Sequence, residues 1–417
     1  MRLPAAVSMD GGASWRDGFR ADYQRVFVEP WSPYAGAILL VMVILGLMIS
    51  GLFWGVFGGL KLWGDWFNSA IGMGDALKIK AELDSPLMHR MSLMNITLLF
   101  GAFAAALMSR QFGITRAPKL EYVWGAFGGT LMGIGATLAG GCTTGGFFTP
   151  ALHSSPAGWM MALGLIAGAV IGLKLLLWTL DNISWGMNAP ESGNSPSRER
   201  HPLFGILIAA TIVTWTVIWA YAADEKLANR AIIVIAGFAM GFILHRSRLC
   251  FARGFREPFM TAEGDMTKAL ILALAIAIPL ASLLFQKKVI DPYVAIPPTF
   301  WAGSLVGGVI FGVGMIFAGG CASGAMWRAG EGNLKLWMAI VFFAWGGSTF
   351  SGILRRWEVM TPDVNLDGLE FTKVGIQAYL PDMLGGWEWA LLVSFGILLL
   401  WYIFVRYNES TETFTVL

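Results

Sequence analysis

Apolar runs long enough to cross a lipid bilayer recur along almost the whole chain. A helix needs about 20 apolar residues to cross the hydrocarbon layer, and its backbone polar groups must pair within the segment itself. The chain is therefore predicted to be an all-α polytopic membrane protein, with about nine or ten transmembrane helices plus short re-entrant or broken helices. The candidate spans are 35–58, 91–108, 123–141, 157–180, 203–222, 231–245, 266–285, 299–319, 334–354 and 389–406. The sixth run is short and predicts a partial or broken span.

The composition excludes several classes of soluble protein. Residues of the set AVILMFWYC make up 56% of the 417 residues, and only 13% are charged, against about 25% in an average soluble domain. The 29 Lys+Arg and 27 Asp+Glu leave a net charge of +2, so the basic excess typical of nucleic-acid binding is missing. The cysteines and histidines show no metal-ligand spacing, and the sequence has no GxxxxGK[ST] motif. We expect no metal, no cofactor, no catalytic residue and no nucleic-acid partner, and predict that the chain is not an enzyme.

Charged and turn-forming residues divide the chain into regions. The N-terminal region has mixed charge and no apolar core beside a small-residue cleavage site, which predicts a cytoplasmic head. A polar, turn-rich segment is predicted to link two membrane halves. The predicted regions are 1–34 (cytoplasmic head), 35–180 (first membrane half), 181–202 (linker), 203–406 (second membrane half) and 407–417 (C-terminal tail).

The most informative internal feature is a repeat. Residues 128–145 are GGTLMGIGATLAGGCTTG and residues 307–324 are GGVIFGVGMIFAGGCASG, with identical glycines, alanine and cysteine at a constant offset. A weaker match pairs HRMSLMN in the first half with HRSRLCF in the second, and places Met94 opposite Cys250. An odd number of predicted crossings separates the two GGC motifs, which orients the copies in opposite directions, as in inverted-repeat transporters. We therefore predict two homologous halves with a substrate site at their interface.

Each copy of the repeat ends in two glycines and a cysteine. The residues are Gly140, Gly141 and Cys142 in the first copy and Gly319, Gly320 and Cys321 in the second. The glycines are expected to break the helices and expose backbone N–H groups that can bind an anion. Each cysteine would then line the opening with a neutral thiol, a weak S–H donor that contacts a sulfur-bearing anion without holding it tightly. The alternative is that each cysteine is a small apolar residue filling a helix crossing.

The third cysteine lies in an arginine-rich segment. Cys250 belongs to HRSRLCFARGF, in which Arg248 and Arg253 are close to it. One interpretation is a cytoplasmic anchor loop; the other is a basic vestibule in which these arginines attract the anion and Cys250 contacts it. Arg328 lies three residues before Glu331, and this spacing favours a local ion pair.

Together these motifs resemble the YeeE/YedE family of bacterial inner-membrane sulfur-transport proteins, in particular its long YedE-type members. The likeness rests on GxGxxxAGGCTTG at 133–145, GFILHRSRLCFARGFRE at 241–257 and GVGMIFAGGCASGAMWRAGEG at 312–332, and it spreads over most of 35–405. The resemblance implies uptake of thiosulfate through a central route, in which the anion passes between cysteine thiols. Cys142, Cys250 and Cys321 match the cysteines of that route.

The resemblance also implies a location and partners. The chain would be a multi-pass protein of the bacterial inner membrane, with a small inorganic sulfur anion and the lipid bilayer as partners, and a cytoplasmic sulfurtransferase-type acceptor as a further candidate. The sequence departs from the family pattern at Met94, where the first-half counterpart of the R-x-C-F segment has no thiol. Long YedE-type members are also linked to selenium metabolism, so a selenium compound or another small sulfur species is the alternative cargo. A membrane thiol-redox protein is a rival of another class, but it favours a CxxC pair, whereas these cysteines are isolated.

Overall fold

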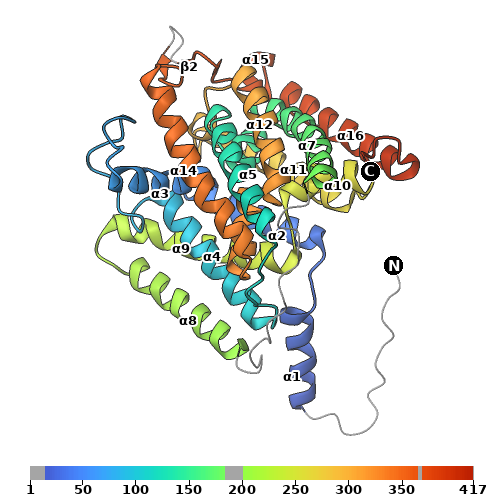
Figure 1. Ribbon diagram of the computed structural model, residues 1–417. Helices are drawn as coiled ribbons and strands as arrows, with labels where there is room; N and C mark the ends of the chain where they lie inside the picture. The colour runs from blue at the N-terminus through green and yellow to red at the C-terminus, as the bar shows by residue number, and fades with distance from the viewer. Residues whose placement is uncertain (1–14, 184–200, 365–368, 417) are drawn as a thin grey trace.

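The computed structural model describes residues 15–183, 201–364 and 369–416, and helices dominate it (Figure 1). Among these residues, nine helical segments are long and apolar enough to cross a membrane, and a tenth is added if a pair bent by 78° counts as one span. The long helices are α2 (Pro33–Ile49), α4 (Arg90–Met108), α5 (Lys119–Leu138), α7 (Pro156–Asn182), α8 (His201–Ala220), α9 (Glu225–Ser247), α11 (Asp265–Gln286), α12 (Ala302–Ala318), α14 (Leu334–Arg356) and α16 (Trp387–Thr411). The predicted all-α polytopic membrane fold is confirmed.

Shorter elements complete the described part of the chain. They are α1 (Trp15–Tyr23), η1 (Gln24–Val28), α3 (Phe57–Ala70), η2 (Thr143–Phe148), α6 (Thr149–Leu152), α10 (Phe251–Met260), η3 (Pro292–Ala295), α13 (Ala322–Gly330), α15 (Leu380–Leu384) and the strands β1 (Asp363–Val364), β2 (Glu370–Thr372) and β3 (Gly375–Ile376). The strands pair antiparallel in the order β1-β2-β3 and were not predicted. Most of the predicted linker 181–202, and residues 1–14 of the predicted head, lie outside the described residues.

Every predicted span coincides with a helix, but two boundaries were wrong. The run 35–58 is interrupted because α2 ends at Ile49 and Gly51 takes a left-handed conformation at φ +71°, after which α3 begins. The sixth run is no partial span, because α9 has 23 residues and begins at Glu225, with the Asp224 side chain accepting a hydrogen bond from its first turn. Charged residues in that first turn lower its mean hydropathy and hid it from the sequence pattern.

The two repeat helices, α5 and α12, pack directly against each other and run antiparallel. A Cβ on Gly135 would lie 2.5 Å from the carbonyl oxygen of Gly307, and a Cβ on Gly128 would lie 2.5 Å from that of Gly314. Only glycine allows backbones to approach this closely, so the repeated glycines form the helix crossing. Gly128 meets the counterpart of Gly135, and Gly135 meets the counterpart of Gly128, a symmetric arrangement that is consistent with the predicted inverted repeat.

The outer neighbours of the two repeat helices come from opposite halves of the chain. Helix α5 of the first half packs along α14 of the second, and α12 of the second half packs along α7 of the first. Glycines form these contacts too: a Cβ on Gly308 would lie 2.6 Å from the Met161 carbonyl oxygen, and one on Gly133 would lie 2.7 Å from the Phe343 carbonyl oxygen. The two halves are therefore interleaved at the centre of the bundle.

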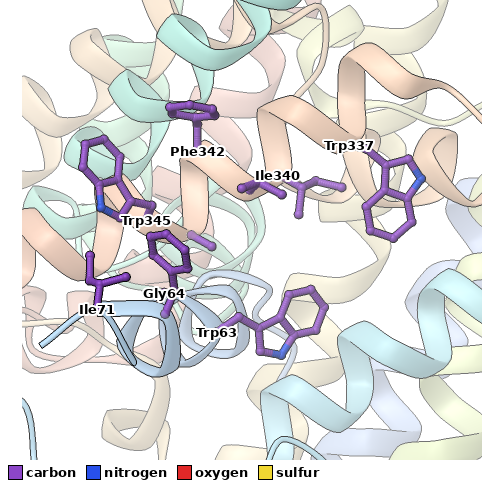
Figure 2. Close-up of a pocket in the computed structure, with 10 residues that line it drawn as sticks. Trp63, Gly64, Ile71, Trp337, Ile340, Phe342 and Trp345 are labelled. Carbon is purple, nitrogen blue, oxygen red and sulfur yellow. The ribbon is translucent and has the colours of Figure 1, made fainter. Parts of the chain in front are cut away.

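A separate apolar groove of about 480 Å³ lies between α3 and α14. Figure 2 shows Trp63 of α3 and Ile71, the residue that follows this helix, opposite Trp337 and Trp345 of α14. The described residues that line this groove carry no charge, so the groove is poorly suited to an anion. The groups suited to an anion lie elsewhere, at the breaks in the repeat helices.

Candidate functional site

Cys142 lies at a break that follows α5. Gly140 has φ +74°, a left-handed conformation that ends the helix and that a residue with a side chain adopts only with strain. Cys142 is then the N-cap of η2, with φ −78° and ψ −170°, and is fully buried. Its sulfur lies 3.1 Å from the Thr144 hydroxyl oxygen. The glycine-induced helix break predicted here is confirmed.

Cys321 lies at the equivalent break after α12. Gly319 has φ +84° and is the C-cap of α12, and Cys321 is the N-cap of α13 with φ −76° and ψ 177°. Its conformation thus matches that of Cys142. The Cys321 sulfur accepts a hydrogen bond from the Gly324 backbone N–H at 3.4 Å and lies 3.6 Å from the Ser323 hydroxyl oxygen. The thiol occupies the place that a serine or aspartate side chain takes at many helix N-termini.

Cys250 lies next to Cys321, at the start of a third short helix. Arg248, in a left-handed conformation at φ 53°, ends α9, and Cys250 is the N-cap of α10. Its sulfur lies beside that of Cys321, next to Gly324. A Cβ built on Gly324 would lie 2.7 Å from the Cys250 sulfur and 3.2 Å from the Cys321 sulfur. Residues far apart in the sequence therefore present two sulfur atoms to one small space, which a glycine keeps open.

The short helices that follow the three cysteines contact one another. Helix α13 contacts both η2 and α10. Aromatic rings join η2 to α10: the Phe148 and Phe251 ring centroids are 5.5 Å apart, and those of Phe147 and Phe255 are 5.2 Å apart. All three cysteines are buried and free of disulfides. The arrangement thus combines buried thiols and helix N-termini within an aromatic environment, which suits a weakly bound, sulfur-bearing anion.

The two arginines predicted to attract the anion are already engaged in ion pairs. Arg248 donates from one guanidinium nitrogen to both Glu331 carboxylate oxygens, at 2.7 and 2.9 Å, and from the other to the Gln111 side-chain oxygen at 2.6 Å. Arg253 pairs with Glu257. Their role in attracting an anion stays a prediction. The expected Arg328–Glu331 pair is wrong, because Glu331 pairs with Arg248.

A cavity adjoins each of the two helix breaks. The first, of about 210 Å³, lies beside Gly140 and Gly141, and the second, of about 420 Å³, lies beside Ala318 and Gly319. The second also includes Pro118 and Glu121 at the start of α5, whereas the first lies beyond the end of that 20-residue helix. A helix of this length spans about 30 Å, so the cavities lie at opposite ends of the bundle.

The sequence analysis missed two residues that line these cavities. The Met91 thioether lines the first cavity, against Gly55 and Gly58. Lys335 lines the second and forms an ion pair with Glu121 at 3.2 Å. A sequence signal existed for each: Met91 belongs to the weaker repeat, and Lys335 is an isolated charge at the start of an apolar run.

Comparison with known proteins decides the family. The model of the family described as "Sulphur transport" matches residues 13–171 and 246–416, which together make up more than half of the chain. The chain belongs to the sulphur-transport family. Both matched segments contain a GGC motif, so the two breaks described above lie in the regions that define this family.

The chain is also similar in sequence to individual transporters. The probable transporter YedE of Escherichia coli is 27% identical over 324 residues, covering 74% of this chain and 78% of its own. The thiosulfate transporter TsuA of Spirochaeta thermophila is 29% identical over 186 residues, covering 43% of this chain and 56% of its own. The TsuA protein of Escherichia coli is 36% identical over 107 residues, covering 26% of this chain and 30% of its own. These relatives are named as transporters, and the chain is a multi-pass membrane protein of their family.

Proposed function

We propose that this protein imports a small inorganic sulfur anion, thiosulfate, across the bacterial inner membrane along a pathway lined by Cys142, Cys250 and Cys321. The observation that carries the proposal is the placement of the Cys250 and Cys321 sulfur atoms on one small space beside Gly324, where α10 meets α13. Two similar relatives are named thiosulfate transporters, which supports thiosulfate as the cargo.

The chemistry of the three breaks fits transient contact with such an anion. An anion entering a dry protein interior loses its hydration and needs donors that replace part of it. Neutral S–H groups and helix N–H groups supply donors without the fixed positive charge of an arginine, so the anion is stabilised but not trapped. The terminal sulfur of thiosulfate is soft and polarisable, and sulfur atoms of the protein match it in this respect.

Glycines flanking the cysteines give the route its shape. Gly140 and Gly319 turn the backbone away from the helix axis by their left-handed conformation. Gly141 and Gly320 then carry the chain into the next short helix, and a Cβ on Gly141 would lie 2.6 Å from the Gly146 backbone nitrogen. A side chain at Gly140 or Gly319 would strain the turn and one at Gly141 would clash, whereas a Cβ on Gly320 would lie 3.5 Å from its nearest neighbour. All four glycines are assigned to the pathway because they flank the cysteines.

Labelled thiosulfate uptake in a bacterial strain without other sulfate or thiosulfate importers tests the proposal. We expect uptake by the wild-type protein, and its loss in the Cys142→Ala and Cys321→Ala variants with an unchanged amount of membrane protein. Ser394→Ala is the matched control, because it likewise removes one buried side-chain atom, on a helix, α16, that contains none of the cysteines. Full uptake by either cysteine variant would refute the thiol role.

Competition in the same assay addresses the choice of cargo. Unlabelled sulfite and selenite are added in excess to wild-type cells during uptake of labelled thiosulfate. Thiosulfate specificity predicts that neither anion reduces uptake as strongly as unlabelled thiosulfate does. If wild-type cells take up selenite but not thiosulfate, the cargo is a selenium compound and the thiosulfate assignment is wrong.

A further inference from the structure

The cavity beside Gly319, which we call the basic cavity, concentrates positive charge from four separate elements. Arg116 lies in the loop before α5, Arg256 on α10, Arg328 on α13 and Lys335 on α14, and all four line the same space of about 420 Å³. One carboxylate, that of Glu121, lines it too. The other lining residues are uncharged, so cations outnumber carboxylates four to one.

Within the described part of the chain, three of these four cations form no ion pair with a carboxylate. Lys335 pairs with Glu121 at 3.2 Å, and the Lys335 side chain is only 15% exposed. Arg328 donates to the Gly319 carbonyl oxygen at 3.0 Å, a neutral acceptor. The Arg256 Nε atom is buried and has no hydrogen-bond partner among the described residues. A buried guanidinium N–H without an acceptor is costly, so this arrangement is suited to an acceptor that arrives with a ligand.

We propose that the basic cavity binds a small divalent oxyanion of the sulfate or thiosulfate type, as a second site distinct from the cysteines. Guanidinium groups match the oxygens of such an anion through charge-assisted hydrogen bonds. The four cations surround a concave space rather than spreading over an outer face, which favours a small ion over an acidic macromolecule. Assigning the transported anion as the ligand in cells rests on the proposed function.

The position of the basic cavity links it to the cysteine route. Ala318 and Gly319 form part of its wall, and Cys321 follows two residues after Gly319. The hydrogen bond from Arg328 to the Gly319 carbonyl oxygen ties a cavity cation directly to the backbone turn that holds this cysteine. An anion leaving the thiols at this end of the bundle enters a space where several positive charges replace the weak S–H donors.

Glu121 supplies an internal competitor for the bound anion. Its carboxylate is 3.2 Å from the Lys335 ammonium nitrogen, and its side chain is 40% exposed. An arriving dianion competes with this carboxylate for Lys335, which weakens binding and allows release. Removing the Glu121 charge is therefore expected to tighten anion binding, an effect opposite to that of removing any of the four cations.

Isothermal titration of the purified full-length protein in detergent, at constant ionic strength, tests the proposal with sodium sulfate and sodium thiosulfate as probes. We expect both salts to bind and to compete with each other. Arg256→Gln and Lys335→Gln should each weaken binding about tenfold or more, the effect of one lost hydrogen bond to a charged group. Glu121→Gln should tighten it. Arg406→Gln, an exposed cation on α16 that pairs with Glu409, is the matched control and should bind as the wild type does.

The outcomes separate this proposal from the proposed function. Cys321→Ala is expected to abolish uptake but to retain sulfate binding, since its thiol is not a wall of the basic cavity. Absence of sulfate and thiosulfate binding in the wild type, or affinities unchanged in Arg256→Gln, Lys335→Gln and Glu121→Gln, would overturn the second site. Cysteine-dependent uptake without such binding leaves the proposed function intact, whereas binding without uptake refutes that function alone. Should the cation variants fail to fold, the tighter binding expected of Glu121→Gln still decides the question.

Discussion

Gly324 keeps the space between two thiols open, and Gly324→Ala should close it. The new Cβ would lie 2.7 Å from the Cys250 sulfur, which must move by about 0.7 Å to reach the 3.4 Å at which ordinary contact begins. Overpacking of this kind costs about 1–3 kcal/mol, while alanine in place of a helical glycine contributes about 1 kcal/mol of stability. The unfolding free energy should therefore fall by at most about 2 kcal/mol, and the protein should remain folded.

Transport should suffer far more than stability. Displacing the Cys250 sulfur breaks its contact with Cys321 and fills the space through which the anion would pass, so we expect thiosulfate uptake to be lost. The initial rate is measured in cells and divided by the amount of folded protein, which is determined by size-exclusion chromatography of the solubilised membrane. Gly396→Ala on α16 is the matched control, because its Cβ would meet no atom within 4 Å.

A double variant separates the clash from the loss of the thiol. Gly324→Ala combined with Cys250→Ala removes the sulfur that the new methyl group would meet, so most of the lost stability should return while uptake stays low. Wild-type uptake by Gly324→Ala at a normal protein level would refute the reasoning, because the space between the two sulfur atoms would then have no part in transport.

Three further predictions concern the packing, the ion pairs and the pH dependence. Gly135→Ala should lower the melting temperature in detergent, because its Cβ would lie 2.5 Å from the Gly307 carbonyl oxygen; an unchanged melting temperature contradicts the close crossing. Arg248→Gln should cost about 1–3 kcal/mol by leaving the Glu331 carboxylate without its ion pair. Adding Glu331→Gln should restore most of that loss in the same measurement, and no recovery would count against the pair. Burial lowers the pKa of His153 to about 4 from 6.5, so the unfolded chain binds the proton first as the pH falls. The unfolding free energy should drop between about pH 6.5 and pH 4, by up to about 3 kcal/mol, and this part of the drop should be absent in His153→Asn.

Hydropathy predicted the spans because lipid imposes a length and an apolar composition on every crossing helix. It did not predict the short helix α3, whose charged side chains lie inside the bundle. Helix α3 carries Lys61 and Asp65, which pair at 2.7 Å, and Asp65 also accepts a hydrogen bond from Ser348 of α14 at 2.5 Å. These partners compensate the charges, but they come from the helix itself and from a distant part of the sequence. A hydropathy average over a stretch of sequence includes the charges but holds no information about the side chains that pair with them.

The candidate site shows a similar division. The repeat predicted equivalent positions for Cys142 and Cys321, and the two backbone conformations agree closely. It could not predict that Cys321 would lie beside a third cysteine while Cys142 contacts the Thr144 hydroxyl, because the spacing of either copy does not encode which distant residues pack together. The basic cavity escaped detection for the same reason, since its four cations lie on four different elements.

The interleaving of the two halves restricts how the protein can move. Many transporters with inverted repeats alternate between open states by rocking one half against the other as rigid bodies. Here α5 is packed between α12 and α14, and the glycine crossings at Gly128, Gly135 and Gly133 bring backbones into direct contact. Such crossings have no side-chain layer that could be rearranged to let one half swing past the other. For the proposed transport we therefore expect small moving parts, namely the thiols, the aromatic rings and the short helices at the breaks, with the crossed helices acting as a stationary frame.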